Sequence, residues 1–273
     1  MMLSLNARSI GMQAWGSGKK SFLLLHGLSR SKACWRDVAP GLAAHGRVVA
    51  LDLPGHGESP LADFSCAMRD FAALVREAIA ALALEDLVIV GHSMGAQVAM
   101  TLLLDTPQVA QRLVLAAPAG IETFTQEEAA LMRAAQTPEK IRAQPRSSVA
   151  KTIGAFTFSP PPDLEEQIAW RMNEMARSDD LAKTISRCVD GMLAGRLFER
   201  LPTLRVPTLV VFGEEDRLIP NRYFHPGVTS ATGAAALAAI PEAQLLMLPQ
   251  TGHMVPEEHP QRLCEAILSF GVQ

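Results

Sequence analysis

The sequence predicts an α/β fold in which helices cover both faces of a mostly parallel β-sheet. Short apolar runs alternate with longer segments of helical periodicity along most of the 273 residues, which is typical of parallel sheets. Hydrophobic residues make up 48% of the chain and charged residues 19%, a balance that favours a globular protein over a disordered one. One long segment without strand patterns interrupts the alternation.

Six apolar runs have the length and composition of buried strands. We expect these strands at Ser21–His26, Arg47–Asp52, Leu87–Gly91, Arg112–Ala116, Thr208–Gly213 and Gln244–Leu248. Residues before Gly16 are expected to form an antiparallel hairpin at the edge of the sheet. Helical patterns lie between the strands, near Cys34–His45, Ser65–Leu84, Met94–Asp105, Val228–Ile240 and Pro260–Phe270.

The interrupting segment runs from Ile121 to Pro202 and carries helical patterns only. Connections between strands are usually a few residues long, so a segment of this length needs a structure of its own. We predict a helical cap that is inserted between two strands and stands over their ends. The chain then divides into a first core part (1–120), the cap (121–202) and a second core part (203–273).

Composition and charge disfavour several classes of partner. The formal net charge is −3 and the basic residues are scattered, so we expect no nucleic-acid and no membrane partner. No apolar run approaches the roughly 18 residues of a transmembrane helix, and the N-terminus lacks a signal-peptide pattern. The four cysteines form no CxxC pair: Cys34, Cys66, Cys188 and Cys264. We expect free thiols in a reducing cytoplasm, with no metal and no cofactor.

The strongest motif lies in Leu87–Met100, where Gly91, Ser93 and Gly95 form a G-x-S-x-G pattern. A buried-strand pattern precedes it and a helical pattern follows it, as a nucleophile elbow requires. Small residues on either side of the serine let the backbone close a strained turn, and the following helix directs positive charge density at the hydroxyl. Ser93 is therefore the predicted nucleophile, and a plain tight turn is the alternative.

A serine hydroxyl needs a general base, and the base needs a group that orients it. His253 follows the last predicted strand, and Asp216 follows the strand before it. Both side chains are therefore expected at the carboxyl ends of strands, on the same rim as Ser93. We predict that His253 takes the proton from Ser93 and that Asp216 fixes the tautomer of the imidazole.

Other carboxylates and histidines compete for these two roles. Glu122 follows a strand end just before the insertion and is the main rival to Asp216, whose neighbours Glu214 and Glu215 are weaker candidates. Five other histidines are expected in packing, turn, loop or surface positions: His45, His56, His92, His225 and His259.

Acyl transfer also needs hydrogen-bond donors for the oxyanion that develops. The backbone N–H of Met94, directly after the nucleophile, is one candidate donor. The second donor should come from the loop after an early strand, where His26, Gly27 and Leu28 follow each other. We expect Gly27 to permit a tight turn that aims the Leu28 N–H into the site, with an ordinary glycine turn as the alternative.

Five motifs in register resemble those of the α/β-hydrolase superfamily. They are HGLSRS (26–31), DLPGHGES (52–59), GHSMG (91–95), GEEDRLIP (213–220) and GHMVPEEHP (252–260), and they span nearly the whole chain. The resemblance implies an eight-stranded, mostly parallel sheet, an insertion that caps the active site, and oxyanion donors at Leu28 and Met94. Within the superfamily the chain is similar to small bacterial carboxylesterases, enol-lactonases, cofactor-free perhydrolases and carbon–carbon bond hydrolases.

The expected function is hydrolysis of a small hydrophobic carboxylic ester, or a lactone, through an acyl-enzyme. Serine at position 93 disfavours epoxide hydrolases and haloalkane dehalogenases, which use an aspartate nucleophile. A carbon–carbon bond hydrolase of ring-cleavage products or an enol-lactonase on the same triad is the alternative. In the carbon–carbon bond hydrolase, Arg171 or Arg177 of the cap would hold a substrate carboxylate. A non-catalytic ligand receptor is a third hypothesis. Apolar side chains of the cap are expected to line the cavity or to pack the cap onto the core.

Overall fold

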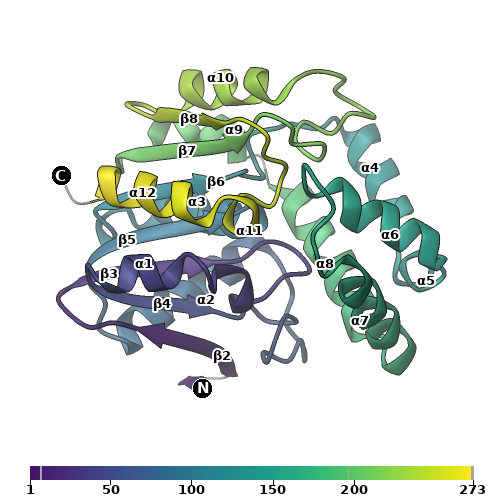
Figure 1. Ribbon diagram of the computed structural model, residues 1–273, viewed down its shortest axis with the longest axis horizontal. Coiled ribbons are helices and arrows are strands. Elements are labelled where there is room, and N and C mark those ends of the chain that lie inside the picture. The colour runs from purple at the N-terminus through teal and green to yellow at the C-terminus, as the bar shows by residue number, and fades with distance from the viewer. Residues whose placement is uncertain (7, 196, 272–273) are drawn as a thin grey trace.

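The computed structural model describes residues 1–6, 8–195 and 197–271. Within them, eight strands form one sheet in the order β1-β2-β4-β3-β5-β6-β7-β8 (Figure 1). The strands are β1 (Met2–Leu5), β2 (Arg8–Trp15), β3 (Lys20–Leu25), β4 (Arg47–Leu51), β5 (Glu85–His92), β6 (Arg112–Ala116), β7 (Thr208–Gly213) and β8 (Gln244–Leu248). The pairs β1–β2 and β2–β4 are antiparallel, whereas the pairs from β4 to β8 are parallel. The predicted mostly parallel sheet with an antiparallel hairpin at its edge is confirmed.

Helices cover both faces of this sheet, with α1 and α12 together on one face and α2 and α3 on the other (Figure 1). The helices outside the insertion are η1 (Lys32–Trp35), α1 (Ala39–Ala43), α2 (Met68–Ala81), α3 (Met94–Asp105), η2 (Pro107–Val109), α10 (Thr229–Ala239), α11 (Val255–Glu258) and α12 (Pro260–Gly271). In the described part of the chain, none of the helices has both the length and the apolar character needed to cross a bilayer.

Two predicted helices differ from the sequence pattern, one by splitting and one by beginning later. The segment Cys34–His45 splits into η1 and α1, because Pro40 in the first turn of α1 has no N–H to continue an earlier helix. Helix α2 starts at Met68 and not at Ser65, because Cys66 has a φ of 62°, which is left-handed and incompatible with a right-handed helix.

Between β6 and β7 the described chain is helical and contains no strand, as predicted for the insertion. Its helices are α4 (Gln126–Ala135), α5 (Pro138–Arg142), α6 (Arg146–Ala155), α7 (Leu164–Arg177), α8 (Asp180–Ala194), α9 (Leu197–Arg200) and η3 (Leu201–Thr203). Helices α4 to α8 stand beside the carboxyl ends of the strands, at the right of Figure 1. Helices α5 to α8 enclose an apolar cluster separate from the main core: Ile141, Val149, Ile153, Ile168, Met175, Ala182, Ile185 and Val189.

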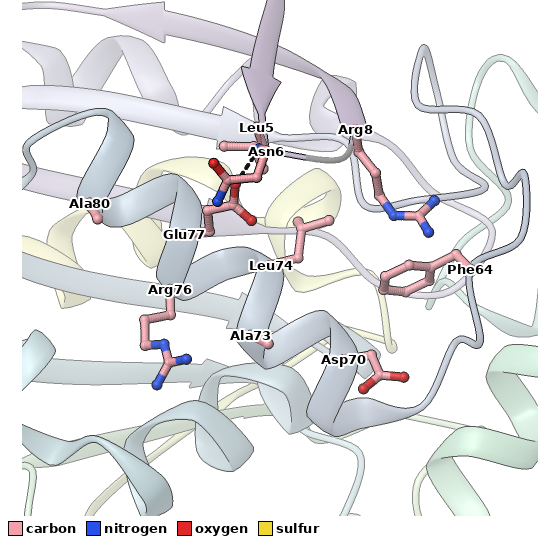
Figure 2. A pocket seen from close by; sticks show the side chains of 10 residues that line it. All are labelled: Leu5, Asn6, Arg8, Phe64, Asp70, Ala73, Leu74, Arg76, Glu77 and Ala80. Atoms are coloured by element: carbon pink, nitrogen blue, oxygen red, sulfur yellow. Dashed lines mark hydrogen bonds between the residues drawn. The ribbon is translucent and has the colours of Figure 1, made fainter.

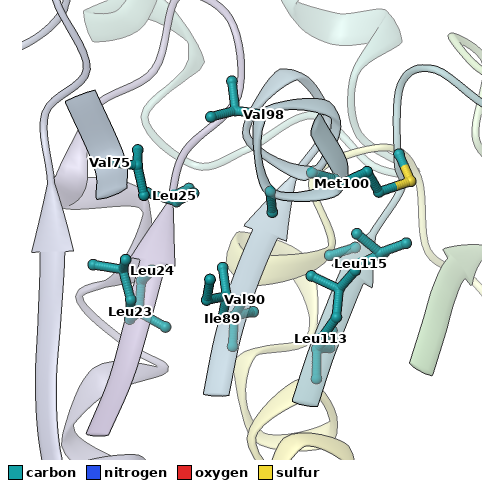
Figure 3. Close-up of a cluster of buried hydrophobic side chains, with 14 of the residues drawn as sticks. Leu23, Leu24, Leu25, Val75, Ile89, Val90, Val98, Met100, Leu113 and Leu115 are labelled. Carbon is teal, nitrogen blue, oxygen red and sulfur yellow. The ribbon is translucent and has the colours of Figure 1, made fainter. Parts of the chain in front are cut away.

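The main core surrounds the central strands β3, β5 and β6. Leu24, Ile89 and Leu113 of these strands are fully buried, and Val98 and Met100 of α3 pack against the same region (Figure 3). Burial of one such side chain contributes roughly 1.5–3 kcal/mol, so the strand ends and the start of α3 are held firmly. This packing fixes the rim on which the predicted site residues lie.

Candidate active site

Ser93 occupies the turn between β5 and α3. Its φ of 52° and ψ of −115° lie outside the usual regions for a residue with a side chain, which costs on the order of 1–3 kcal/mol. The two motif glycines make this turn possible by close approach. A Cβ on Gly91 would lie 2.5 Å from the Ala96 Cα, and a Cβ on Gly95 would lie 2.3 Å from the Leu25 carbonyl oxygen. The spacing of the motif is therefore explained by backbone contacts that leave no room for a side chain.

The structure brings the predicted nucleophile, base and acid together in one chain of hydrogen bonds. Ser93 Oγ lies 3.0 Å from His253 Nε2, and His253 Nδ1 lies 2.8 Å from Asp216 Oδ2. The other carboxylate oxygen, Asp216 Oδ1, accepts hydrogen bonds from the N–H groups of Leu218 and Ile219 at 2.7 and 3.0 Å. All three side chains are buried. A carboxylate in this position favours a proton on His253 Nδ1, which leaves Nε2 free to accept the proton of Ser93.

Glu122, the rival acid, lies in a different cluster. Its Oε1 accepts a hydrogen bond from the Asn221 N–H at 2.8 Å and lies 2.5 Å from His225 Nδ1. Burial raises the pKa of this carboxyl. Glu122 thus connects the segment after β6 to the loop after Asp216, while Glu214 and Glu215 are exposed.

Glu258, which lies in the motif GHMVPEEHP but received no role from the sequence, holds the loop that carries His253. Its carboxylate accepts hydrogen bonds from the backbone N–H groups of Gly252, Met254 and Phe158. Burial raises the pKa of the Glu258 carboxyl. One of these donors, Phe158, is 100 residues away in the sequence. The only sequence signal for this role of Glu258 is its position close to the Gly-His pair.

The segment after α6 contacts the histidine loop directly. The N–H groups of His253 and Met254 both donate to the Phe156 carbonyl, at 2.7 and 3.1 Å. The rings of Phe156 and His253 lie 6.4 Å apart. A Cβ on Gly252 would lie 2.6 Å from the Phe158 nitrogen, so glycine is required there by the backbone of the insertion. The insertion therefore lies next to the His253 imidazole and also helps to hold the loop that carries it.

Of the two predicted donor residues, Met94 follows Ser93 in the chain and Leu28 lies in the loop after β3. Met94 is the first residue of α3, where backbone N–H groups have no carbonyl partner within the helix. Leu28 follows Gly27, whose φ is not left-handed. A Cβ on Gly27 would lie 2.8 Å from His92 Nδ1 and 3.1 Å from the Ser93 Cβ. Glycine at this position is thus required for close packing against the serine turn, and not for the backbone conformation that the sequence suggested.

Three buried histidines support this rim in their neutral form. His92 Nε2 donates to the His253 carbonyl at 2.9 Å, and burial together with His253 lowers the pKa of His92 well below its ordinary value. His26 Nε2 accepts the Leu53 N–H at 3.0 Å, and burial lowers the pKa of His26 to about 3. Burial lowers the pKa of His56 to about 4. These residues act through packing and hydrogen bonds and carry no charge near neutral pH.

Two cavities differ in their relation to these residues. A cavity of about 620 Å³ lies between the β1–β2 hairpin and α2, and its lining includes Leu5, Arg8, Phe64 and Leu74 but no member of the triad (Figure 2). A cavity of about 240 Å³ lies between the insertion and the loop after β3. Its lining includes Ser29, Ile153, Phe156, Trp170, Arg171 and Leu181. Because Phe156 also contacts His253, this smaller cavity borders the candidate site.

Arg171 and Arg177, the two cap arginines considered above, have opposite surroundings. Arg171 is only 8% exposed, and within the described residues its Nε has no hydrogen-bond partner. Burial lowers the pKa of Arg171. Arg177 is exposed and pairs with Glu174 at 3.2 Å. Across residues 1–6, 8–195 and 197–271, no three His, Cys, Asp or Glu side chains are grouped so as to hold a metal ion.

Comparison with known proteins places this geometry in a family. The chain is 29% identical over 269 residues to sn-1-specific diacylglycerol lipase from Mus musculus, covering 92% of this chain and 80% of that protein. An esterase from Exiguobacterium antarcticum shares its fold with a TM-score of 0.80 at 20% identity, over 100% of this chain and 99% of the esterase. The 2-hydroxy-6-oxo-6-phenylhexa-2,4-dienoate hydrolase from Rhodococcus sp. strain RHA1 has a TM-score of 0.80 at 21% identity, over 100% and 98%.

At these identities the solved structures show a common fold and do not identify a substrate. The family model described as the alpha/beta hydrolase family matches residues 22–266, which is most of the chain. The chain therefore belongs to the alpha/beta hydrolase family.

Proposed function

We propose that this protein is a serine hydrolase that cleaves a small hydrophobic carboxylic ester, or a lactone, through an acyl-enzyme. The observation that carries the proposal is the continuous chain of hydrogen bonds from Ser93 through His253 to Asp216. Such a chain turns a weakly nucleophilic hydroxyl into a reactive one. The strained backbone of Ser93 supports the same conclusion, because strain of this kind clusters where a reacting group must be presented.

In the proposed first step, Ser93 Oγ attacks the carbonyl carbon of the substrate while its proton passes to His253 Nε2. Asp216, hydrogen-bonded at Nδ1, stabilises the imidazolium that forms. The negative charge on the carbonyl oxygen faces the backbone N–H groups of Leu28 and Met94. One donor of this kind typically contributes about 10²–10³ in rate.

The tetrahedral intermediate then collapses. His253 gives its proton to the leaving alkoxide, the carbon–oxygen bond breaks, and the alcohol departs, which leaves Ser93 acylated. Water then gives a proton to His253 and attacks the acyl carbon. Collapse of this second intermediate returns the proton to Ser93 and releases the carboxylic acid.

We propose that residues 121–202 act as a cap that selects the substrate. Their apolar side chains fall into three groups. Ile168 and Met175 belong to the cap's own apolar cluster, whereas Phe156 and Trp170 line the cavity beside the histidine loop. A third group, Met192 and Phe198, packs against the main core. Lining of the cavity and packing onto the core are therefore both supported, each for different residues. The apolar part of the cavity lining supports a hydrophobic acyl group as the substrate portion that the cap contacts.

Hydrolysis of p-nitrophenyl butyrate by the wild-type protein and by Ser93→Ala tests the proposal. We expect the variant to lose at least about 10³-fold in kcat/KM, and His253→Ala to lose a similar amount. The double variant should be no slower than either single variant, because the residues act as a unit. Activity that survives Ser93→Ala unchanged would refute the mechanism.

Covalent labelling separates an enzyme from a receptor that retains this fold. An alkyl fluorophosphonate should add to Ser93 of the folded protein, and intact-protein mass spectrometry should show one adduct that Ser93→Ala lacks. A folded wild-type protein that resists labelling and does not hydrolyse esters would favour the non-catalytic ligand receptor.

Arg171 favours a second candidate function, which is hydrolysis of a carboxylate-bearing substrate by a carbon–carbon bond hydrolase or an enol-lactonase. Its guanidinium is buried, lines the cavity, and has an unpaired Nε among the described residues. A buried N–H group without an acceptor is costly, and a substrate carboxylate would supply that acceptor. Two carboxylates of the chain, Asp163 and Glu166, line the same cavity. Arg177, being exposed and already paired, offers no such site.

A matched pair of esters tests this candidate. We expect Arg171→Leu to reduce the ratio of kcat/KM for mono-p-nitrophenyl glutarate over p-nitrophenyl valerate by about 10- to 100-fold if Arg171 binds the carboxylate. Arg177→Leu is the control and should leave the ratio unchanged. An unchanged ratio in Arg171→Leu would leave the neutral ester as the proposed substrate.

A further inference from the structure

Two cysteines meet where α8 of the insertion packs against the segment that precedes α2. Cys66 and Cys188 are both fully buried and belong to the same apolar cluster. A hydrogen bond with Cys188 lowers the pKa of the Cys66 thiol, and the same contact together with burial raises the pKa of Cys188 well above its ordinary value. The proposed hydrolysis uses neither residue.

The backbones on either side of this pair are in direct contact. Thr184, Cys188 and Gly191 are spaced four and three residues apart, so they share one face of α8. A Cβ on Gly191 would lie 2.1 Å from the Cys66 carbonyl oxygen, and a Cβ on Gly55 would lie 2.5 Å from Thr184 Oγ1. This face of α8 therefore lies against the core without room for larger side chains. The close packing keeps Cys188 of α8 beside Cys66.

Cys66 is the member of the pair that is better suited to react as a thiolate. It has a φ of 62°, a left-handed conformation that a residue with a side chain rarely adopts and that the surrounding contacts maintain. The Arg187 side chain donates to the Phe64 carbonyl at 3.2 Å, two residues before Cys66. Its positive charge further lowers the pKa of Cys66. The thiolate is the form of cysteine that attacks peroxides and sulfenic acids.

We propose that Cys66 and Cys188 are a redox-modification site, at which a peroxide joins them in a reversible disulfide that fastens α8 to the core. The thiolate of Cys66 attacks one oxygen of hydrogen peroxide and breaks the O–O bond, which gives a sulfenic acid and hydroxide. The Cys188 sulfur then attacks the sulfenic sulfur, its proton is taken up, and water leaves as the S–S bond forms. In total two thiols are oxidised by two electrons and one peroxide is reduced to two waters.

A low-molecular-weight thiol reverses the modification. Two equivalents of glutathione restore both cysteines and leave as oxidised glutathione. In a reducing cytoplasm, the compartment we propose, the pair would therefore stay reduced until peroxide rises. Because both thiols are buried, the oxidant reaches them only when α8 separates locally from the core, so the reaction should be slow. This site is independent of the proposed hydrolase activity and does not require it.

Peptide mapping of peroxide-treated protein tests the proposal. Folded wild-type protein is incubated with hydrogen peroxide, its remaining thiols are blocked with N-ethylmaleimide, and the digest is analysed by mass spectrometry. We expect a linked peptide that contains Cys66 and Cys188 and that dithiothreitol separates. The bond should raise the midpoint of thermal unfolding by about 5–10 °C under non-reducing conditions, because it closes a long loop of the chain.

Variants at the other two cysteines are the matched controls. Cys34→Ala and Cys264→Ala should leave the linked peptide and the thermal shift intact, whereas Cys188→Ala should abolish both. If Cys188→Ala does not fold, the doubly substituted protein Cys34→Ala/Cys264→Ala is mapped instead. Cys66 and Cys188 are then the remaining cysteines, and the linked peptide should still form. The proposal is overturned if the folded protein yields no such peptide, or if the peptide forms only in denaturant.

Discussion

Replacing Asp216 by asparagine should reduce kcat/KM for ester hydrolysis by about 10³-fold or more without disturbing the fold. The structure determines how the new amide is oriented. Because the Leu218 and Ile219 N–H groups donate to Oδ1, the amide oxygen must take that position. The amide nitrogen then replaces Oδ2, 2.8 Å from His253 Nδ1, and donates to it. The imidazole proton moves to Nε2, which faces Ser93 and can no longer accept the serine proton.

The magnitude follows from the charge that Asp216 supplies. When Ser93 attacks, His253 becomes an imidazolium beside the carboxylate. Two unit charges about 4 Å apart in an effective dielectric of about 20 attract each other by about 4 kcal/mol, which corresponds to about 10³-fold in rate. The unfavourable tautomer acts in the same direction, so this value is a lower bound.

Steady-state hydrolysis of p-nitrophenyl butyrate is the assay, with circular dichroism and thermal unfolding to verify the fold. Glu122→Gln is the matched control, because Glu122 is also a partly buried carboxylate paired with a histidine, His225. We expect it to change kcat/KM by less than about threefold, because it leaves the charge beside His253 in place. The reasoning is wrong if Asp216→Asn stays within tenfold of the wild type, or if Glu122→Gln loses as much activity.

Three further predictions concern stability and the histidine loop. Folding lowers the pKa of His56 from 6.5 to about 4, so the unfolded chain binds the extra proton between these pH values. His56 alone should therefore lower the free energy of unfolding by up to about 3 kcal/mol from pH 7 to pH 4, in addition to the contributions of His26 and His92. Urea titrations should show a shallower fall for His56→Asn. Gly191→Ala should destabilise the protein by at least about 1–3 kcal/mol, because its Cβ would meet the Cys66 carbonyl, whereas Gly154→Ala, with open space around it, should stabilise α6 by about 0.5–1 kcal/mol. Glu258→Ala leaves three backbone N–H groups without their acceptor and should lower kcat more than it raises KM, with a lower melting temperature; an unchanged kcat would contradict this role.

The positions of Ser93, Asp216 and His253 could be predicted because each lies within five residues of the end of a strand. Strand patterns are local, and parallel strands that succeed one another in the sheet end on the same rim. The six strand predictions consequently lie within two residues of the observed bounds. The choice between the two carboxylates is not local, because Glu122 also follows a strand, β6. Glu122 pairs with His225, 103 residues away in the sequence, whereas Asp216 pairs with His253.

Features that depend on distant contacts could not be predicted in this way. The role of Glu258 depends on a hydrogen bond from the Phe158 N–H, and no local pattern connects the two residues. The reason for glycine at position 27 lies in the ring of His92, which comes from another strand. Burial of Arg171 also depends on how the cap helices pack together, because a charged residue on an amphipathic helix is exposed by default.

The insertion and the loop that carries His253 are connected by hydrogen bonds. His253 and Met254 both donate to the Phe156 carbonyl at the end of α6, so the cap cannot move away from the core unless it breaks these bonds or carries the loop with it. At about 1 kcal/mol each, the two bonds favour the closed arrangement by about 30-fold. If the insertion acts as the cap that we propose, substrate access and the position of the imidazole are coupled. A cap that opened by breaking these bonds would release His253 from one of its supports, and closing over the substrate would restore it beside Ser93.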